Sequence, residues 1–273
     1  MMKTASVNGV ELEYESVGTG EPVLLISPVL ADGFVPLVAE RALADRCRLV
    51  VYHKRGWVGS TRTPGPVTVA EHAADASALL DHLGIARAHI AGHSSGAAVA
   101  LQLAIDHPEK VHSLVLLEPS LLTVPGAQAF FAKAGPAFDA FAAGDREQAI
   151  AIFLAAASGL PWDECRAILE ARMPGSVAQS IKDADTFFGV ELPGLQQWTF
   201  TPEQAAQVRQ PTLSILGKQT EPLWVDVDAL LRSAMPNIVS TTIQDAGHLL
   251  HIQNPQPVAR AFSAFLDRNP IQA

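Results

Sequence analysis

Short apolar runs alternate with longer amphipathic segments along the first 117 residues of the chain. The runs have apolar residues at successive positions, as expected of strands that are covered on both faces. They occupy residues 22–26, 47–52, 88–91 and 111–117. The segments between them have apolar or small residues at helical spacing and occupy residues 36–45, 69–83 and 96–106. Before them, Asn8-Gly9 predicts a hairpin turn. The order strand, helix, strand predicts a parallel sheet with crossover helices.

This alternation stops near residue 119 and resumes near residue 211. The intervening stretch is rich in alanine, phenylalanine and helix-forming residues, with proline or glycine breaks. Strand-like and helical segments then return at residues 211–216, 227–234, 238–243 and 257–266. Because the chain returns to the same sheet, we expect one α/β domain, 1–273, with a mostly parallel central sheet and flanking helices. A helical cap is expected as an insertion at about 119–210.

The composition narrows the class of protein. Of 273 residues, 48% are hydrophobic and 17% are charged, which favours a packed core over disorder. The formal net charge of -9 repels phosphate backbones and anionic lipids, so we expect no nucleic-acid or membrane partner. The two cysteines, Cys47 and Cys165, lie far apart and predict no disulfide framework. Without an apolar leader or a run of membrane-spanning length, the chain is expected to be cytoplasmic.

The motif Gly92-His93-Ser94-Ser95-Gly96 provides a candidate nucleophile. It follows a predicted strand and opens a predicted helix, which is the setting of a nucleophile elbow. The tight turn requires residues without side chains two positions before and after the serine, and Gly92 and Gly96 meet this requirement. Ser94 is therefore the candidate nucleophile. The backbone N–H of Ser95, at the start of the helix, is a candidate donor to an oxyanion.

A serine hydroxyl needs a general base to accept its proton near neutral pH. Among nine histidines, His248 follows the last predicted strand and precedes the last helix. A loop in this place can bring an imidazole over the elbow, since the chain order serine, acid, histidine is typical of this arrangement. His251 is a rival, but the residues after it resemble the approach to a helix, so we favour His248.

The third member, an acid that orients the histidine, has two candidates. The usual position follows the strand at residues 211–216, and Thr220 occupies it here. Glu221, one residue later, is one candidate. Glu118 is the other and the favoured one, because it ends the strand beside the elbow strand, where sites of open α/β sheets collect. A carboxylate beside the apolar run at 114–117 also needs a partner, which an imidazolium would supply.

These motifs resemble those of the α/β-hydrolases over nearly the whole chain. The segment Arg55-Gly56-Trp57-Val58-Gly59-Ser60 resembles the loop that follows the fourth strand in that family, and Gly247-His248 resembles its histidine loop. Within the superfamily, residues 92–122 resemble zearalenone-type lactone hydrolases, which take their triad glutamate from the end of the strand after the elbow. The resemblance thus implies an α/β-hydrolase fold and Glu118 as the acid.

One departure from the family concerns the oxyanion hole. Ser27-Pro28 replaces the familiar His-Gly after the third strand. Proline has no N–H, so Pro28 cannot donate. The resemblance therefore implies the N–H of Val29 as the second oxyanion donor beside that of Ser95.

An apolar substrate pocket is expected beneath the cap, because ligand pockets are mostly apolar and a cap shields the site from water. Candidate substrate-binding aromatic residues lie on loops at the sheet edge and in the cap. They are Phe34, Trp57, Trp162, Phe187, Phe188 and Trp198. No metal site and no cofactor are expected, because no ligand spacing and no phosphate-binding glycine loop occur in the sequence.

Together the residues predict a serine hydrolase that cleaves a carboxylic ester or lactone through an acyl-enzyme on Ser94. Its partner would be a small apolar ester or lactone. Three alternatives stay open: a hydrolase of carbon–carbon bonds, a cofactor-free haloperoxidase-like enzyme, and a ligand receptor of low turnover on the same fold. The oligomeric state is also open, a homodimer being one option.

Overall fold

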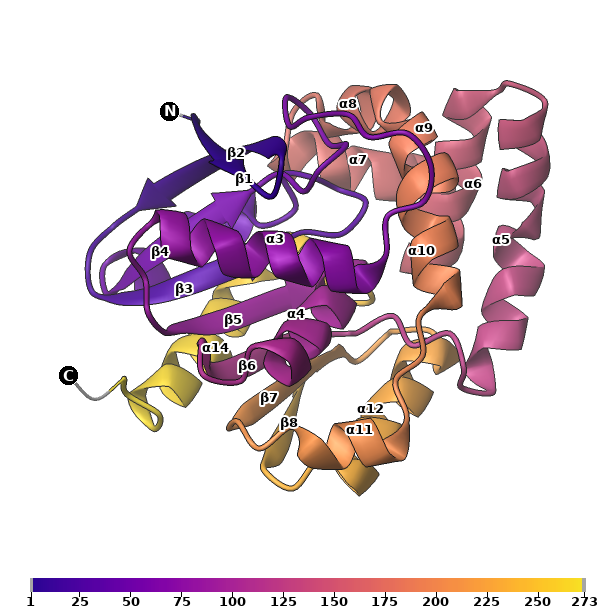
Figure 1. The fold of residues 1–273 in the computed structure, drawn as a ribbon. Helices are drawn as coiled ribbons and strands as arrows, with labels where there is room; N and C mark the ends of the chain where they lie inside the picture. The colour runs from indigo at the N-terminus through magenta and orange to yellow at the C-terminus, as the bar shows by residue number, and fades with distance from the viewer. Residues whose placement is uncertain (1, 272–273) are drawn as a thin grey trace.

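One central sheet organises the protein (Figure 1). The computed structural model describes residues 2–271, and within them eight strands form the order β1-β2-β4-β3-β5-β6-β7-β8. The strands are β1 Lys3–Val7, β2 Val10–Val17, β3 Glu21–Ile26, β4 Cys47–Tyr52, β5 Ala88–His93, β6 Val111–Leu117, β7 Thr212–Gly217 and β8 Ile238–Ile243. β1 and β2 pair antiparallel to their neighbours, and β4, β3, β5, β6, β7 and β8 are parallel. The mostly parallel sheet predicted from the sequence is thereby confirmed.

Helices lie on both faces of this sheet. They are α1 Val35–Val38, α2 Arg41–Ala44, α3 Val69–His82, α4 Ser95–Asp106, α12 Pro222–Ala234, α13 Leu250–Gln253 and α14 Pro255–Asp267. Figure 1 shows α3 and α4 in front of the sheet and α14 behind it. This is the crossover arrangement that parallel strands require.

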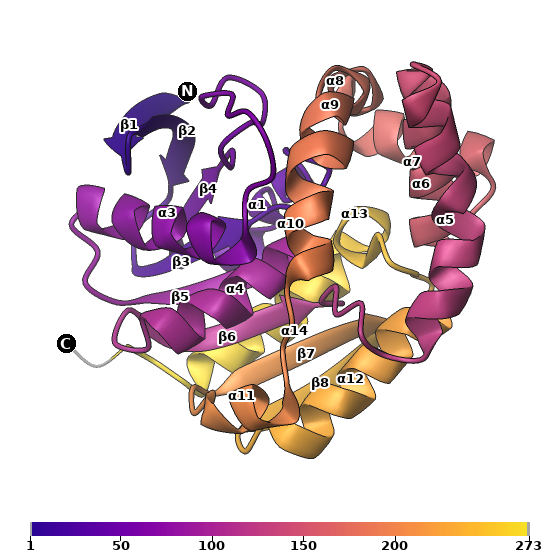
Figure 2. The ribbon, with the colours of Figure 1, turned by 45° about the vertical axis from the view of Figure 1, so that its right-hand side comes forward.

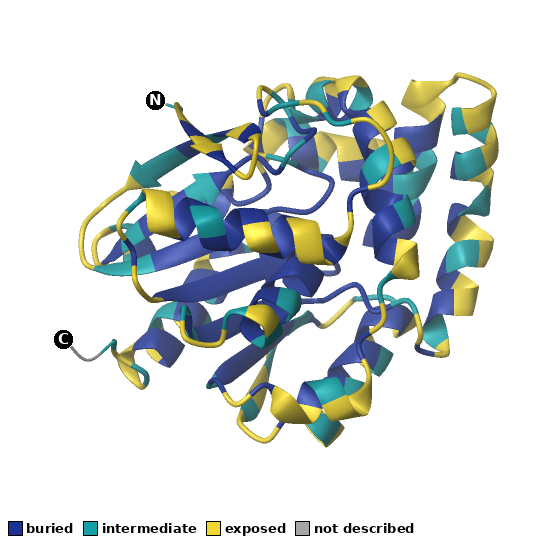
Figure 3. Ribbon diagram, in the orientation of Figure 1, coloured by how far each residue is buried: buried dark blue, intermediate teal, exposed yellow. Residues whose placement is uncertain are grey.

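Successive residues of the inner strands enter two different cores. In β3, Leu24 and Ile26 join the core that includes α3 and α4, whereas Val23 and Leu25 join the core formed with α1, α2 and α14. Side chains alternate along a strand, so a sheet covered on both faces needs apolar residues at every position. Figure 3 shows the inner strands and the inward helix faces as buried.

Local signals set the bounds of α3, which lies within one residue of the predicted helix. Thr68 caps its first turn by accepting from the N–H of Glu71, and the Glu71 carboxylate accepts from the N–H of Thr68. This reciprocal pair satisfies two N–H groups that have no partner inside the helix. Gly84, with φ +65°, follows the helix in a conformation that side chains rarely adopt.

The prediction of a single helix at residues 36–45 is wrong. Two helices of one turn each, α1 and α2, occupy this region, because Glu40 between them has an extended backbone with ψ 120°. Leu37 and Leu43 both pack into the core with α14, so the apolar spacing that predicted a helix reflects burial. The break turns the chain back toward β4.

The helices between β6 and β7 form a separate layer at one end of the sheet. They are α5 Gly126–Ala142, α6 Arg146–Ser158, α7 Trp162–Arg172, α8 Ser176–Lys182, α9 Ala184–Thr186, the π-helix η1 Phe187–Glu191, α10 Leu192–Gln197 and α11 Pro202–Gln207. Figures 1 and 2 show α5 to α10 standing beyond the carboxyl ends of the parallel strands. In contrast, α11 lies lower, beside α12. We refer to α5–α10 as the cap.

A buried ion pair connects the N-terminal hairpin to the rest of the fold. Arg55 donates from Nε and Nη2 to the two carboxylate oxygens of Asp75, both at 2.6 Å. Asn8, in the hairpin turn, donates to the same carboxylate at 3.1 Å. Asp75 is only 1% exposed, so its charge depends on these partners.

Replacing Asp75 by asparagine should therefore destabilise the protein by about 3 kcal/mol, because Arg55 would lose its bidentate partner in a low-dielectric site. Urea unfolding measures the loss. Asp45→Asn is the control, since Asp45 pairs with Arg41 on the surface, where the two side chains are 54% and 90% exposed. Its free energy of unfolding should change little. Equal losses in the two variants would contradict the special role of the buried pair.

Candidate active site

Ser94 lies in a strained turn between β5 and α4. Its backbone has φ 55° and ψ -120°, and few residues with a side chain adopt a positive φ. A Cβ on Gly96 would lie 2.0 Å from the carbonyl oxygen of Ile26, and one on Gly92 would lie 2.4 Å from that of Gly96. Both positions therefore require glycine. The turn presents the Ser94 side chain at the carboxyl edge of the sheet and at the N-terminus of α4.

His248 and Glu118 form a buried hydrogen-bonded pair beside this turn. Nδ1 of His248 lies 2.7 Å from Oε2 of Glu118, and the two side chains are 4% and 0% exposed. Glu118 follows β6 with φ 45°, another left-handed residue, which turns its carboxylate toward the last loop of the chain. Because Nδ1 faces the carboxylate, Nε2 is left to face the cavity that Ser94 and His248 both line.

Thr220 explains why the acid comes from β6. The hydroxyl of Thr220, at the usual position of the acid, donates to Oε2 of Glu118 at 2.8 Å, and the N–H of Gly217 donates to Oε1 at 2.7 Å. The loop after β7 thus supplies donors to a carboxylate rather than a carboxylate of its own. Glu221, the second candidate, instead pairs with Lys133 at 2.7 Å near the surface.

Burial sets the protonation of the pair. It raises the pKa of Glu118 to about 8, although the N–H of Gly217 and the hydroxyl of Thr220 act to lower it. Burial lowers the pKa of His248, so the imidazole is neutral at neutral pH. A neutral imidazole with an oriented Nδ1–H can accept a proton at Nε2, which is the property that a general base needs.

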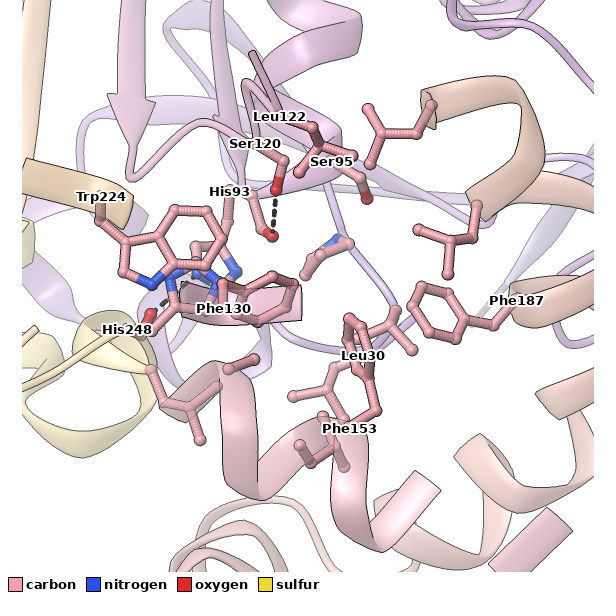
Figure 4. Close-up of a pocket in the computed structure, with 18 of the residues that line it drawn as sticks. Leu30, His93, Ser95, Ser120, Leu122, Phe130, Phe153, Phe187, Trp224 and His248 are labelled. Carbon is pink, nitrogen blue, oxygen red and sulfur yellow. Dashed lines mark hydrogen bonds between the residues drawn. The ribbon is translucent and has the colours of Figure 1, made fainter. Parts of the chain in front are cut away.

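Two further side chains contact Ser94 and His248, and neither was among the predicted site residues. The hydroxyl of Ser120 lies 2.9 Å from that of Ser94 (dashed line from Ser120 in Figure 4). The indole of Trp224 stacks on the His248 ring at a centroid distance of 3.7 Å and an interplanar angle of 6°, as Figure 4 shows. Ser120 stands two residues after Glu118, which is a signal in the sequence, whereas Trp224 is brought to His248 only by folding.

The other histidines of this region serve as packing groups. Nε2 of His93 lies 2.9 Å from the carbonyl oxygen of His248 and so ties the histidine loop to the elbow. His251, the rival base, is fully buried between His93 and Phe34, with ring centroids 4.3 Å and 5.1 Å away. Within residues 2–271, neither ring nitrogen of His251 has a hydrogen-bond partner.

A cavity with about 600 Å³ of empty space, its mouth included, adjoins Ser94. Its polar lining consists of serine and histidine side chains beside the elbow, and Val29 and Ser95 border it there. Much of the remaining wall comes from the cap. These cap residues are Phe130, Phe131, Phe153, Leu154, Ala157, Phe187, Leu192 and Leu195. In the described part of the chain, no Asp, Glu, Lys or Arg lines this cavity.

Within the described residues, the backbone N–H groups of Val29 and Ser95 are free of backbone acceptors and could donate to a ligand. Ser95 is the first residue of α4, so its N–H has no acceptor inside the helix. Val29 lies in the loop after β3, and no backbone carbonyl of residues 2–271 accepts from its N–H. Both groups therefore border the cavity without a backbone partner.

Among the predicted substrate-binding residues, only Phe187 lines this cavity. Phe34 is 1% exposed and packs against His251 in the core that includes α14, so it faces away from Ser94. Trp57 is also 1% exposed, and its Nε1 donates to Glu191 at 2.7 Å. The prediction is wrong for both residues, because each is a core side chain at the sheet edge.

Three cap aromatics also lie outside the cavity lining, contrary to prediction. Phe188 stacks on Phe141 between cap helices, with ring centroids 4.9 Å apart. Trp198 donates from Nε1 to Gln102 of α4 at 2.8 Å. Trp162 is partly buried at the start of α7 and packs against the core. The helical spacing of these aromatic residues predicted that they are buried. It did not distinguish residues that pack within the cap from residues that line the pocket.

Residues 2–271 contain no group of three or more His, Cys, Asp or Glu side chains arranged to hold a metal ion. No helix within the same range combines the length and apolarity needed to cross a membrane.

The family follows from the comparison of the chain with known families. The family model for the alpha/beta hydrolase fold matches residues 31–255, which include the elbow, Glu118 and His248. The chain therefore belongs to the alpha/beta hydrolase fold family, as its sequence motifs predicted. The family and the relatives in sequence described below also support a hydrolase.

Among proteins similar in sequence are several named RutD, candidate carbamate hydrolases. The match to RutD of Azorhizobium caulinodans has 34% identity over 116 residues, which is 42% of this chain and 44% of that protein. In this match the chain thus spans less than half the length of its relative. RutD of Klebsiella pneumoniae matches more broadly, with 29% identity over 241 residues, covering 85% of this chain and 86% of the relative.

Solved structures of other hydrolases share the fold. The enol-lactonase from Burkholderia xenovorans superposes with a TM-score of 0.78 at 21% identity, covering 97% of this chain and all (100%) of its own. A thermophilic esterase from Thermogutta terrifontis gives a TM-score of 0.76 at 20% identity, covering 99% of this chain and 100% of its own. At such low identity these likenesses concern the fold alone.

The buried His251 should make the protein sensitive to acid. Burial holds its pKa well below the ordinary value, so below about pH 6.5 the unfolded chain binds a proton that the folded protein does not. Between about pH 7.5 and about pH 5 this difference removes about 2 kcal/mol of stability. His251→Leu should remove that loss, as measured by urea unfolding at the two pH values.

His107→Leu is the control for this experiment, because His107 lies at the surface, where water contacts it in both states. Its variant should keep the pH dependence of the parent protein. A His251→Leu variant with an unchanged pH dependence would mean that His251 becomes protonated within the folded state.

Proposed function

We propose that the protein is a serine hydrolase that cleaves an uncharged carboxylic ester or lactone with an apolar acyl or ring portion. One observation carries the proposal: Ser94 and His248, which is hydrogen-bonded to the buried Glu118, border a single cavity whose outer wall is apolar. An apolar wall without a charged side chain supports neutral substrates, because an anionic group there would lose its hydration without gaining a partner.

In this proposal Ser94 exchanges its hydrogen bond with Ser120 for one with Nε2 of His248. His248 accepts the proton as the Ser94 oxygen attacks the carbonyl carbon, and Glu118 stabilises the imidazolium that forms. The N–H groups of Val29 and Ser95 hold the oxyanion of the tetrahedral intermediate. His248 then returns the proton to the leaving alkoxide, and a water molecule activated by His248 releases the acid from Ser94.

Carbamate hydrolysis is the second candidate, because two of the RutD proteins, from Pseudomonas syringae and Klebsiella pneumoniae, align with 76% and 85% of this chain. The same serine, base and oxyanion donors could act on a carbamate carbonyl. The apolar cap wall argues against a carbamate anion as the substrate and in favour of a neutral ester. Cleavage of carbon–carbon bonds would use the same residues, so a common panel of substrates must separate these activities.

Ser94→Ala should abolish the hydrolysis of p-nitrophenyl esters, because it removes the nucleophile. A loss of several orders of magnitude, about 10⁴-fold or more, is typical of such a change. A panel of esters with short and longer acyl chains, a lactone, a carbamate and a diketone would identify the preferred substrate. Ser120→Ala is the matched control, since it deletes a neighbouring hydroxyl and should leave substantial turnover. Equal activity in Ser94→Ala and wild type would refute the proposal.

Glu118→Gln should lose most turnover, up to about 10⁴-fold, because a neutral amide neither stabilises the imidazolium nor enforces its tautomer. Glu221→Gln is the matched control and should retain nearly all activity, since Glu221 pairs with Lys133 near the surface. Steady-state turnover of one ester and the melting temperature are measured for both variants. If Glu221→Gln is the impaired variant, the acid acts from the loop after β7.

A further inference from the structure

A second buried charge pair contacts the elbow at Ser95. Lys54, in the loop after β4, donates from Nζ to Oε1 of Glu191 at 2.6 Å. Their side chains are 2% and 4% exposed. Glu191 ends the π-helix η1 of the cap, so the pair connects the cap to the sheet edge.

The Glu191 carboxylate has two additional donors. The hydroxyl of Ser95 donates to Oε1 at 2.6 Å, and Nε1 of Trp57 donates to Oε2 at 2.7 Å. Burial raises the pKa of Glu191, but the charge of Lys54 and the hydrogen bonds from Lys54 and Ser95 bring it below its ordinary value, so the group is an anion. One carboxylate thus joins the cap, the loop after β4 and the residue that follows Ser94.

Stability alone does not account for such a pair. Removing two charges from water is costly, and apolar residues of similar size often stabilise a protein equally well or better. The geometry offers another role. The tether from Glu191 acts on the first turn of α4, whose first N–H, that of Ser95, borders the cavity. The same π-helix carries Phe187 into the cavity wall, and π-helical turns are frequent at functional sites.

We propose that Glu191 is a positioning residue, which holds the oxyanion donor Ser95 in register with the cap through the Ser95 hydroxyl. This inference rests on the proposed function, because it assigns the N–H of Ser95 to the oxyanion. Lys54 keeps the carboxylate ionised, and the hydrogen bond from Trp57 to Oε2 helps to orient it toward Ser95. A cap that is correctly seated over the cavity then also sets the position of the donor.

The cap offers a matched control in Asp183. Its side chain is 1% exposed and accepts hydrogen bonds from Arg62 and from the N–H of Val58, in the same loop after β4 that carries Lys54. Asp183 therefore anchors the cap to the same loop through a buried carboxylate. Within residues 2–271, the remaining hydrogen bond to this carboxylate comes from the Gln179 side chain, so none of the donors to the carboxylate belongs to the elbow.

The test uses the full chain, p-nitrophenyl butyrate as substrate and a fluorophosphonate as a second probe of Ser94. The variants are Glu191→Gln, Ser95→Ala, their double variant, and Asp183→Asn. Glu191→Gln and Ser95→Ala should each lower kcat about tenfold to hundredfold with KM nearly unchanged, because a small displacement of an oxyanion donor is felt mainly in the transition state. Asp183→Asn should keep kcat close to the wild-type value.

The double variant separates positioning from general anchoring. If Glu191 acts through the Ser95 hydroxyl, Glu191→Gln with Ser95→Ala should lower kcat no more than the more impaired single variant. Losses that multiply, or equal losses of kcat in Glu191→Gln and Asp183→Asn, would overturn the inference. If Glu191→Gln does not fold, Ser95→Ala alone decides, because wild-type activity there would also overturn it.

Ser94→Ala, measured beside these variants, separates the two proposals. Turnover and labelling that persist without Ser94 would refute the proposed function and the inference that rests on it. Turnover and labelling that require Ser94 but ignore Glu191 and Ser95 would refute the inference alone.

Discussion

The close approach of the backbone at Ser94 is the constraint on which the site depends. Without a Cβ at Gly92 and Gly96, β5 can pass directly into α4 against the end of β3. The turn stores strain in the positive φ of Ser94, and the buried strand and helix on either side hold it in place. Because β3, β5 and β6 are neighbours, Val29, Ser94 and Glu118 all emerge at the same edge of the sheet.

Two buried carboxylates flank this turn, and each is supplied with donors from distant segments. Glu118 accepts from the loop after β7 and faces the histidine loop. Glu191 accepts from the loop after β4 and from Ser95 of α4. A carboxylate in an apolar surrounding is stable only with such partners, so each one specifies where several loops must lie. The order of the site therefore comes from satisfying buried charge as much as from apolar packing.

Sequence patterns predicted the parts of this arrangement that depend on local chemistry. The apolar runs located the strands, and the glycines two positions from Ser94 indicated the tight turn. Thr220, at the usual position of the acid, favoured Glu118, and the Thr220 hydroxyl donates to that carboxylate in the folded protein. These signals are readable because a strand, a tight turn and a strand end each restrict the residue types at fixed positions.

The residues that the sequence did not reveal are those placed by tertiary contacts. Phe34 and Trp57 are aromatic, as many pocket residues are. In the folded protein, however, Phe34 packs against His251 and Trp57 donates a hydrogen bond to Glu191. Trp224 lies in α12 and belongs to no recognisable sequence motif. Its indole stacks on the His248 ring only in the folded protein. The spacing of apolar residues indicates that a side chain is buried but not which neighbours it packs against. The residues that line a pocket beneath an inserted cap therefore cannot be predicted from this spacing.

The cap and the polar groups at the elbow depend on each other. Its apolar side chains form much of the cavity wall, and in such a low-dielectric surrounding hydrogen bonds and charges interact more strongly than they would in water. The same low-dielectric surrounding gives every unpaired buried polar group a high cost in free energy. The cap must therefore bring a polar contact of its own, Glu191, to the place where it meets Ser95 of the elbow. A cavity with apolar walls and a small group of hydrogen-bonded polar side chains at the elbow meets both requirements.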